Sequence, residues 1–185
     1  NPYGESKLMF ERVLEWYDRI HGLRHVNLRY FNAAGASKKY GEHHRIETHL
    51  IPNVLKVALG QGPHVEVYGT DHPTPDGTCI RDFIHIIDLA QAHELALDAK
   101  ASASYNIGTG SGYSVRQIID VARQVTGHPI PIAERPARPG DPPRLMASAD
   151  KLRRELGWRP KFESIEAIVA SAWHWHQAHP EGYQD

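Results

Sequence analysis

The chain has 185 residues, of which 41% are hydrophobic and 23% are charged. This balance is typical of a globular protein with enough apolar side chains for a core, and it excludes a disordered chain or a coiled coil. The 21 Lys and Arg side chains are matched by 22 Asp and Glu side chains, which leaves a net charge of -1. Such a chain has no basic field, so we expect neither nucleic acid nor a membrane as a partner.

Cysteine usage and apolar runs give an expectation about the compartment. Cys79 is the single cysteine, which excludes an internal disulfide framework and fits a reducing environment. No apolar run approaches the length of about 18 to 20 residues that a membrane span needs, and the start of the chain does not resemble a secretory signal. We therefore expect a cytoplasmic protein.

The elements predicted in chain order alternate between helix and strand. A helix over 1–22 is indicated by Asn1 as its cap, Pro2 at its first position, apolar residues at helical spacing and Gly22 at its end. A loop of small residues is expected at 32–36, a polar loop at 69–78 and a proline-rich segment at 135–143. Further helices are expected at 48–59, 87–99, 114–126, 149–156 and 164–178, and strands at 23–31, 64–68, 79–86, 104–107 and 130–134. This alternation predicts an α/β fold with parallel strand pairs.

Tyr3 and Lys7 are four positions apart on the first helix, so they share one helical face. The plain structural interpretation is that the tyrosine ring packs against the aliphatic part of the lysine side chain, because this spacing is common by chance. The chemical interpretation is that a nearby ammonium group favours the phenolate form of a tyrosine. Such a tyrosine could take a proton from a sugar hydroxyl while hydride leaves the same carbon.

Several segments resemble one enzyme family. Residues 1–7 (NPYGESK) are similar to the Tyr-x-x-x-Lys element of the extended short-chain dehydrogenases/reductases, and residues 30–36 (YFNAAGA) to the segment after their next strand. Residues 68–85 (YGTDHPTPDGTCIRDFIH), together with 173–176 (WHWH) and 180–183 (PEGY), closely resemble the UDP-glucose 4-epimerase branch of that family.

The resemblance covers essentially the whole chain but only the second half of the sequences in that branch. It implies the C-terminal part of a Rossmann-like fold, with the N-terminal dinucleotide-binding half absent, plus a small α/β substrate-binding domain. On this basis residues 1–36 are the last part of the Rossmann-like domain with the catalytic helix. Residues 37–185 mainly bind the UDP-sugar, and about 79–107 return to the Rossmann-like sheet.

The glycine-rich loop that seats a dinucleotide pyrophosphate is not found in the chain. Residues 108–112 (GTGSG) follow a predicted strand and precede a predicted helix, but the third glycine of G-x-G-x-x-G would fall on Tyr113. We therefore interpret this segment as a turn. The serine or threonine that contacts the substrate hydroxyl in this family would also lie upstream of Asn1.

The resemblance implies roles for individual residues. Tyr3 would be the general acid/base, and Lys7 its electrostatic partner and a ribose contact, with Phe31 near the nicotinamide of NAD. Arg81 and Arg138 match the arginines that hold the substrate diphosphate, a role that suits planar guanidinium groups. Without the resemblance, each arginine would be interpreted as a surface ion-pair former. The other substrate-binding residues implied are Asn32, His49, Leu50, Val67, Tyr68, Asp141 and Leu145.

Five of these positions carry further expectations. His49 departs from an Asn-Leu pattern, so its backbone is the better candidate for a contact than its side chain. Val67 and Tyr68 match a segment that flanks the uracil, and Asp141 matches a ribose ligand. Leu145 aligns with a position that is a bulky tyrosine in some relatives, so its smaller side chain predicts room for an N-acetyl group and use of UDP-GlcNAc beside UDP-glucose.

The implied function is NAD-dependent, reversible epimerisation at C4 of UDP-glucose and UDP-galactose through a 4-keto intermediate, by the complete enzyme as a homodimer. A nucleotide-sugar 4,6-dehydratase or another sugar epimerase of the extended family is the enzymatic alternative. A non-catalytic chain that binds UDP-sugar is the other alternative, and we expect the 185 residues alone to be inactive.

The 13 histidines raise the question of a metal site. His43 and His44 are adjacent, and His174 and His176 are two apart on a predicted helix and face different sides. Neither spacing suits chelation, so no metal site is expected. The four tryptophans are expected in core or interface packing.

Overall fold

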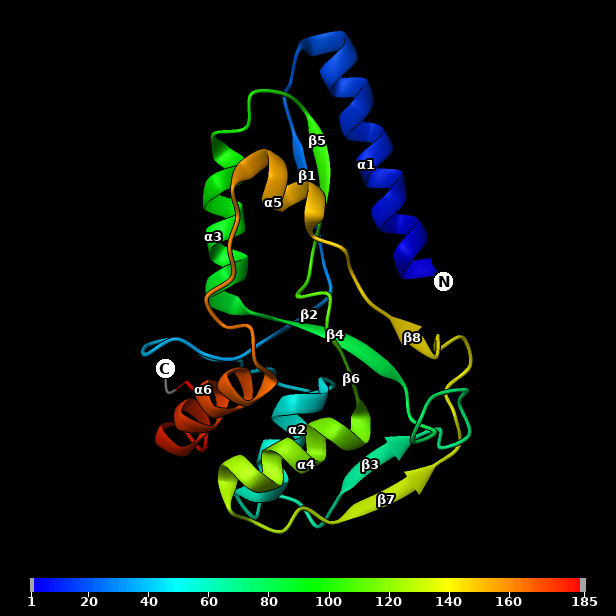
Figure 1. The fold of residues 1–185 in the computed structure, drawn as a ribbon, viewed down its shortest axis with the longest axis vertical. Coiled ribbons are helices and arrows are strands. Elements are labelled where there is room, and N and C mark those ends of the chain that lie inside the picture. Colours follow the sequence, from blue (N-terminus) through cyan, green and yellow to red (C-terminus); the bar gives the residue numbers. More distant parts are fainter. Residues whose placement is uncertain (1, 184–185) are drawn as a thin grey trace.

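The structure is a computed structural model, and it describes residues 2–183 (Figure 1). The helices are α1 (Pro2–His21), α2 (Leu50–Ala58), α3 (Ile86–Leu97), α4 (Val115–Thr126), α5 (Asp150–Leu156) and α6 (Ile165–Ala178). The strands are β1 (Val26–Tyr30), β2 (Asn32–Ala34), β3 (Val65–Tyr68), β4 (Ile80–His85), β5 (Ala103–Ile107), β6 (Gly112–Ser114), β7 (Ile132–Arg135) and β8 (Arg144–Leu145).

Strand β4 pairs with β2, β6 and β8, whereas the pair of β1 and β5 and the pair of β3 and β7 form separate sheets. Parallel pairs join β1 to β5, β3 to β7 and β2 to β4, and β8 also pairs with β4 in parallel. The pair of β4 and β6 is antiparallel, with Ile80 opposite Ser114. The α/β class and the parallel strand pairs are therefore confirmed, and the antiparallel pair with β6 adds a strand that was not predicted.

The predicted helices are present with ends within a few residues of the expected positions, because their apolar periodicity is long enough to detect. Three short strands were not predicted. Residues 32–34, expected in a loop, form β2. Strand β6 begins at the last residue of the segment 108–112 interpreted as a turn, and β8 directly follows the proline-rich segment 135–143. Strands of two or three residues are too short to show an alternation of apolar and polar side chains in the sequence. The expected cap Asn1 lies outside the described residues.

Two hydrophobic cores lie on either side of β4. One gathers buried side chains from α2, β3, α4 and α6, and the other gathers side chains from β1, β5, α3 and α5. Phe83 belongs to the first core and its neighbour Ile84 to the second, because successive strand residues point to opposite faces. Figure 1 shows β4 passing between the two groups of elements.

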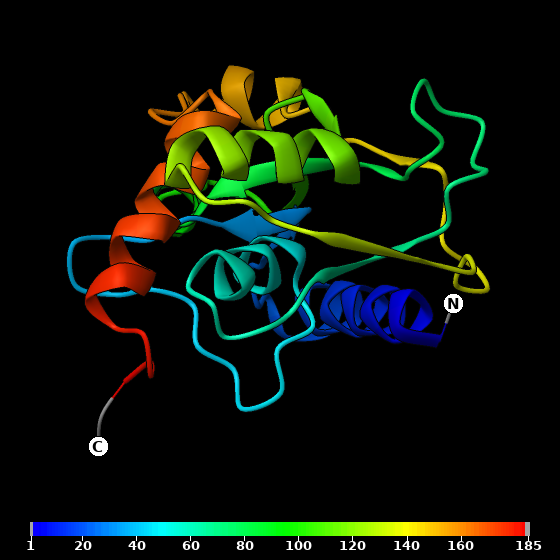
Figure 2. The same ribbon diagram turned by 90° about the horizontal axis from the view of Figure 1, so that it is seen from below.

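Helix α1 covers one side of β1, and α5 lies on the other side (Figure 2). No residue of α1 is buried, and the helix is fastened to β1 by a two-contact ion pair between Glu11 and Arg29. This hydrogen-bonded pair lowers the pKa of Glu11 and raises that of Arg29. The outer face of α1 is unusually apolar for exposed surface and carries Tyr3, Leu8, Met9, Phe10, Val13, Trp16, Tyr17 and Ile20.

Buried polar groups join the segments between these elements. Asp88, at the start of α3, accepts hydrogen bonds from the backbone N–H groups of Lys161 and Phe162, at 2.7 and 2.9 Å. The His85 ring stacks on Phe162 with 3.7 Å between ring centroids and contacts Ser171 of α6. In the described part of the chain, no helix combines the length and apolar character that crossing a bilayer requires.

Candidate active site

The first turns of α1 bring together the predicted catalytic pair. The Lys7 ammonium nitrogen lies 5.2 Å from the centroid of the Tyr3 ring, within the range of a cation–π contact. Tyr3 is 72% exposed, so its hydroxyl is accessible to a ligand. Figures 1 and 2 both place this end of α1 on the side of the molecule that carries β8 and the segment 136–143.

Phe31 and Asn32 occupy the junction between β1 and β2, and both are partly exposed. The Phe31 N–H donates to the carbonyl of Ile107 at 3.3 Å. The Asn32 side-chain amide donates to the backbone carbonyl of Asp82 at 2.9 Å. This bond fixes the amide and leaves its carbonyl oxygen as the group that can accept from a ligand.

The two predicted phosphate arginines lie around one proline-rich turn. Arg81, in β4, donates to the Pro142 carbonyl at 2.7 Å and lies 3.6 Å from an Asp141 carboxylate oxygen. The guanidinium carbon of Arg138 sits 3.8 Å from the centroid of the Tyr68 ring. Asp141 donates its N–H to the Arg138 carbonyl at 3.3 Å, so the same turn positions both arginines.

Leu145 and Val67 have contrasting environments. Leu145 is 45% exposed and lies opposite Arg81 in the β4–β8 pair. Val67 is fully buried in the first core, so no part of this residue is exposed to a ligand in the structure. Its neighbour Tyr68 is partly exposed, and its hydroxyl donates to Glu66, which also pairs with Arg135. These two hydrogen bonds hold the pKa of Glu66 below its ordinary value.

Asp82 is a residue of the site that sequence reasoning missed. It is fully buried beside Arg81, and one carboxylate oxygen accepts from the N–H and hydroxyl of Thr109, at 2.9 and 2.8 Å. The other oxygen accepts from the N–H groups of Gly110 at 3.0 Å and Ala147 at 3.1 Å. Asp82 therefore anchors two loops beside the arginine turn. An aspartate within a predicted strand, next to the apolar Phe83 and Ile84, was the available sequence signal.

The same contacts hold residues 108–111 in a turn that leads into β6 at Gly112. The N–H groups of Thr109 and Gly110 point to the Asp82 carboxylate, so they are not available to a pyrophosphate. A Cβ placed on Gly108 would come within 2.5 Å of an Asp82 carboxylate oxygen. The glycine is needed here because the carboxylate approaches the backbone closely.

Asp76 organises the polar loop before β4. It accepts hydrogen bonds from the N–H and hydroxyl of Thr78, at 2.9 and 2.8 Å, and from the hydroxyl of Ser114. Burial raises the pKa of Asp76, but these hydrogen bonds outweigh it and leave the pKa below its ordinary value. Ser114 also caps α4 through the Gln117 N–H at 3.1 Å.

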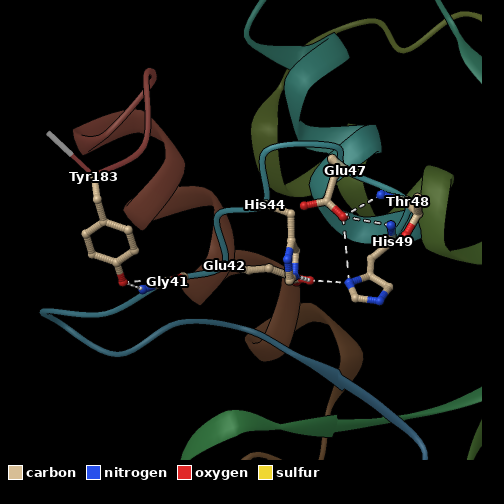
Figure 3. A network of polar contacts seen from close by, with 7 residues as sticks. All are labelled: Gly41, Glu42, His44, Glu47, Thr48, His49 and Tyr183. Carbon is tan, nitrogen blue, oxygen red and sulfur yellow. Dashed lines mark hydrogen bonds and ion pairs between the residues drawn. The ribbon is translucent and has the colours of Figure 1, made fainter. Parts of the chain in front are cut away.

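His49 and Leu50 lie apart from the arginine turn, at the start of α2. His49 has no side-chain role in capping the helix, and its Nδ1 atom contacts the Glu42 carboxylate instead. His44 contacts the same carboxylate oxygen at 3.1 Å, and Glu47 lies 3.7 Å from His49 Nδ1 (Figure 3).

Comparisons with known proteins place the chain in a family. The model of the GDP-mannose 4,6-dehydratase family matches residues 1–171. The chain therefore belongs to this family of extended short-chain dehydrogenases/reductases.

The relatives that resemble it strongly share a more specific name. The UDP-glucose 4-epimerase of Halalkalibacterium halodurans is 52% identical over 99% of the chain, and that of Streptococcus mutans is 49% identical over all of it. The crystal structure of UDP-glucose 4-epimerase from Bifidobacterium longum in complex with NAD+ and UDP matches 99% of the chain with a TM-score of 0.93 at 43% identity. The chain spans 57% of the length of both curated relatives and 56% of that crystallised chain.

Proposed function

We propose that this chain supplies the proton-transfer pair and the diphosphate contacts of an enzyme that interconverts UDP-glucose and UDP-galactose through a 4-keto sugar. The observation that carries the proposal is the arginine turn, on the same side of the molecule as the N-terminal end of α1, whose first turn contains the exposed Tyr3. The strong similarity to UDP-glucose 4-epimerases supports it.

Tyr3 takes the proton from the C4 hydroxyl and returns it after the 4-keto sugar has turned over in the site. In the first step the Tyr3 phenolate accepts the proton and becomes the neutral phenol, and the phenolate is restored when the proton returns. The positive charge beside it is the Lys7 ammonium group, which lies 5.2 Å from the centroid of the Tyr3 ring. Both side chains are exposed and point from the same helical face, so a sugar ring can reach them together.

NAD is the cofactor in this proposal, and it supplies the hydride acceptor and donor when bound. The residues present fit its nicotinamide and ribose: Lys7 offers a cationic donor, and Phe31 a partly exposed apolar side chain. Residues 108–112 do not fit its pyrophosphate, because Asp82 already occupies their N–H groups. A second segment must therefore hold the pyrophosphate.

Arg81 and Arg138 hold the substrate diphosphate. Arg81 is positioned by the Pro142 carbonyl, which leaves part of its guanidinium fork for phosphate oxygens. Arg138 stacks on Tyr68, which orients the guanidinium plane while its N–H groups stay exposed. Asp141 accepts from a ribose hydroxyl, Tyr68, beside the buried Val67, is the partly exposed residue of the segment proposed to flank the uracil, and Leu50 offers its N–H at the start of α2.

The distribution of the cores supports a two-part division of the chain. Residues 1–36 and about 79–107 form the Rossmann-like part around the core of β1 and β5, and α5 packs on the same core. The remaining residues of 37–185 form the UDP-sugar part around α2, α4 and α6. The exposed apolar side chains of α1 from Leu8 to Ile20, among them Trp16 and Tyr17, are the proposed contact of a homodimer, in a cytoplasmic enzyme.

UDP binding tests the diphosphate contacts without requiring turnover. Arg138→Gln should weaken UDP binding, measured by isothermal titration calorimetry, by about tenfold or more, because a charge-assisted pair is lost. Arg154→Gln, on exposed α5, is the matched control and should leave the affinity unchanged. Equal UDP affinity in both variants would contradict the proposal.

Turnover tests the proton-transfer role in the enzyme that contains this chain. Tyr3→Phe should lower kcat by about 100-fold or more and leave UDP affinity within about twofold, since the ring stays and only the hydroxyl is lost. A wild-type kcat in the variant would refute the role. UDP binding without any turnover by the wild-type enzyme would favour a non-catalytic UDP-sugar-binding protein.

A nucleotide-sugar 4,6-dehydratase is the second candidate, favoured by the description of the matching family model. Both reactions begin with the same oxidation at C4, so Tyr3 and Lys7 do not distinguish them. Product analysis after incubation with UDP-glucose does: UDP-galactose supports the epimerase, and a 4-keto-6-deoxy sugar supports the dehydratase.

We also propose that the enzyme accepts UDP-GlcNAc. Leu145 is exposed next to Arg81 in the strand register, where a tyrosine would project a larger side chain. Leu145→Tyr should lower kcat/KM for UDP-GlcNAc by about tenfold and change that for UDP-glucose little. No detectable turnover of UDP-GlcNAc by the wild-type enzyme would reject this proposal.

A further inference from the structure

Four potential metal ligands meet in the segment that leads into α2. One ligand atom from each of Glu42, His44, Glu47 and His49 lies within 4.8 Å of all the others (Figure 3). We propose that these four side chains bind one transition-metal dication of the zinc class. The inference does not depend on the proposed function.

The donor set determines the class of cation. Two imidazole nitrogens and two carboxylate oxygens suit Zn²⁺ and its neighbours Co²⁺ and Ni²⁺, whereas Mg²⁺ and Ca²⁺ prefer oxygen ligands alone. Zinc commonly takes four such ligands in a tetrahedral arrangement. His44 Nε2 lies 3.1 Å from Glu42 Oε1, and His49 Nδ1 lies 3.7 Å from Glu47 Oε1. These separations are close to the spacing of ligand atoms around one ion.

Burial and charge favour a cation at this position. The side chain of Glu47 is only 3% exposed and that of Glu42 19%, so two carboxylates are withdrawn from water at one place. The side chains that pair with these carboxylates are the imidazoles of His44 and His49, which are 51% and 60% exposed. A dication would balance both negative charges and could enter from the side of the exposed imidazoles.

The backbone around the cluster is already fixed. Glu47 accepts from the N–H groups of Thr48 and His49, at 2.8 and 2.7 Å, which fixes the carboxylate at the start of α2. On the other side, the Tyr183 hydroxyl accepts from the Gly41 N–H at 2.9 Å and lies 3.0 Å from the Gly41 carbonyl (Figure 3). Ligands held at both ends lose little conformational entropy when an ion binds.

Proton binding is the competing explanation of the cluster. Imidazolium groups on His44 and His49 would also balance the two carboxylates, with Glu42 as their shared acceptor. Because both imidazoles must be deprotonated to ligate a metal, the two explanations predict different responses to added metal.

Zinc titration of metal-free, tag-free protein tests the proposal. Isothermal titration calorimetry with ZnCl₂ should give one site per chain, and His44→Gln and Glu42→Gln should each weaken it by about tenfold or more. His174→Gln and Glu163→Gln replace exposed residues of the same types elsewhere and should leave zinc affinity unchanged. Equal zinc affinity in all four variants, or no binding by the wild type, would overturn the proposal.

A spectroscopic measurement on the wild type covers the case in which a variant is misfolded. Substoichiometric Co²⁺, which is paramagnetic, should broaden or shift the imidazole proton resonances of His44 and His49 before that of His174. Uniform effects on all exposed histidines would indicate nonspecific surface binding and would refute the site.

Discussion

The buried Asp82 carboxylate offers the sharpest test of how the site is held. In Asp82→Asn, one oxygen can still accept from Thr109, but an amide NH₂ replaces the oxygen that accepts from Gly110 and Ala147. Two backbone N–H groups then face a donor instead of an acceptor. The shape of the side chain is almost unchanged, so the effect comes from hydrogen bonding and charge.

The magnitude follows from the two lost bonds. Hydrogen bonds to a charged group contribute about 1.5 to 3 kcal/mol each, and a buried donor without a partner carries a desolvation penalty of similar size. We expect Asp82→Asn to lower the free energy of unfolding by about 3 to 5 kcal/mol. This is a large share of the 5 to 15 kcal/mol typical of a folded domain.

Urea denaturation followed by tryptophan fluorescence measures this change, since Trp158 lies in the core beside β5. Asp98→Asn, at an exposed position just after α3, is the control and should shift the free energy of unfolding by less than about 0.5 kcal/mol. An Asp82→Asn protein within about 1 kcal/mol of the wild type would refute the view that this carboxylate anchors the two loops.

Three further outcomes are expected. Burial lowers the pKa of His85 and of His176 in the folded protein. Below the ordinary histidine pKa of about 6.5 the unfolded chain therefore binds more protons than the folded chain, and stability should fall as pH drops from 6.5 toward 5. An unchanged Tm over this range, measured by calorimetry, would contradict this expectation. Ser114→Ala removes the cap of α4 and the hydroxyl that donates to Asp76, and should cost about 1 to 2 kcal/mol in urea denaturation. Gly35→Ala should cost more than about 2 kcal/mol, because φ is +86° there and the new Cβ would lie 2.5 Å from the His85 ring; a neutral effect in the same assay would show that the loop adjusts freely.

Local features of the sequence were enough for much of the secondary structure and for one pair in the site. The long helices carry apolar residues at helical spacing, a pattern that is visible in the sequence whatever the helix packs against. The ends of α1, α4 and α6 were therefore predicted within a few residues. Tyr3 and Lys7 could be paired for the same reason, because the i,i+4 geometry of a helix does not depend on the rest of the fold.

Other features were not predicted because they depend on distant partners. The strand β6 exists through pairing with β4, from which it is separated by more than twenty residues. The pattern around Val67 could not show that its side chain faces a core built from α4 and α6. The fold of the 42–49 segment brings together two histidines and two glutamates, a cluster that the histidine spacing considered in the sequence did not reveal.

The sequence by itself therefore determined the class of fold, the long helices and the chemistry available on each segment. Only the tertiary structure decided which of these segments meet. It placed Arg81 and Arg138 at one proline-rich turn, and it buried the Asp82 carboxylate where that group accepts hydrogen bonds from two loops. The physical reason is range: helical periodicity arises from neighbours within four residues, whereas a buried carboxylate or a shared ligand site needs partners that the chain brings together only when the cores have formed.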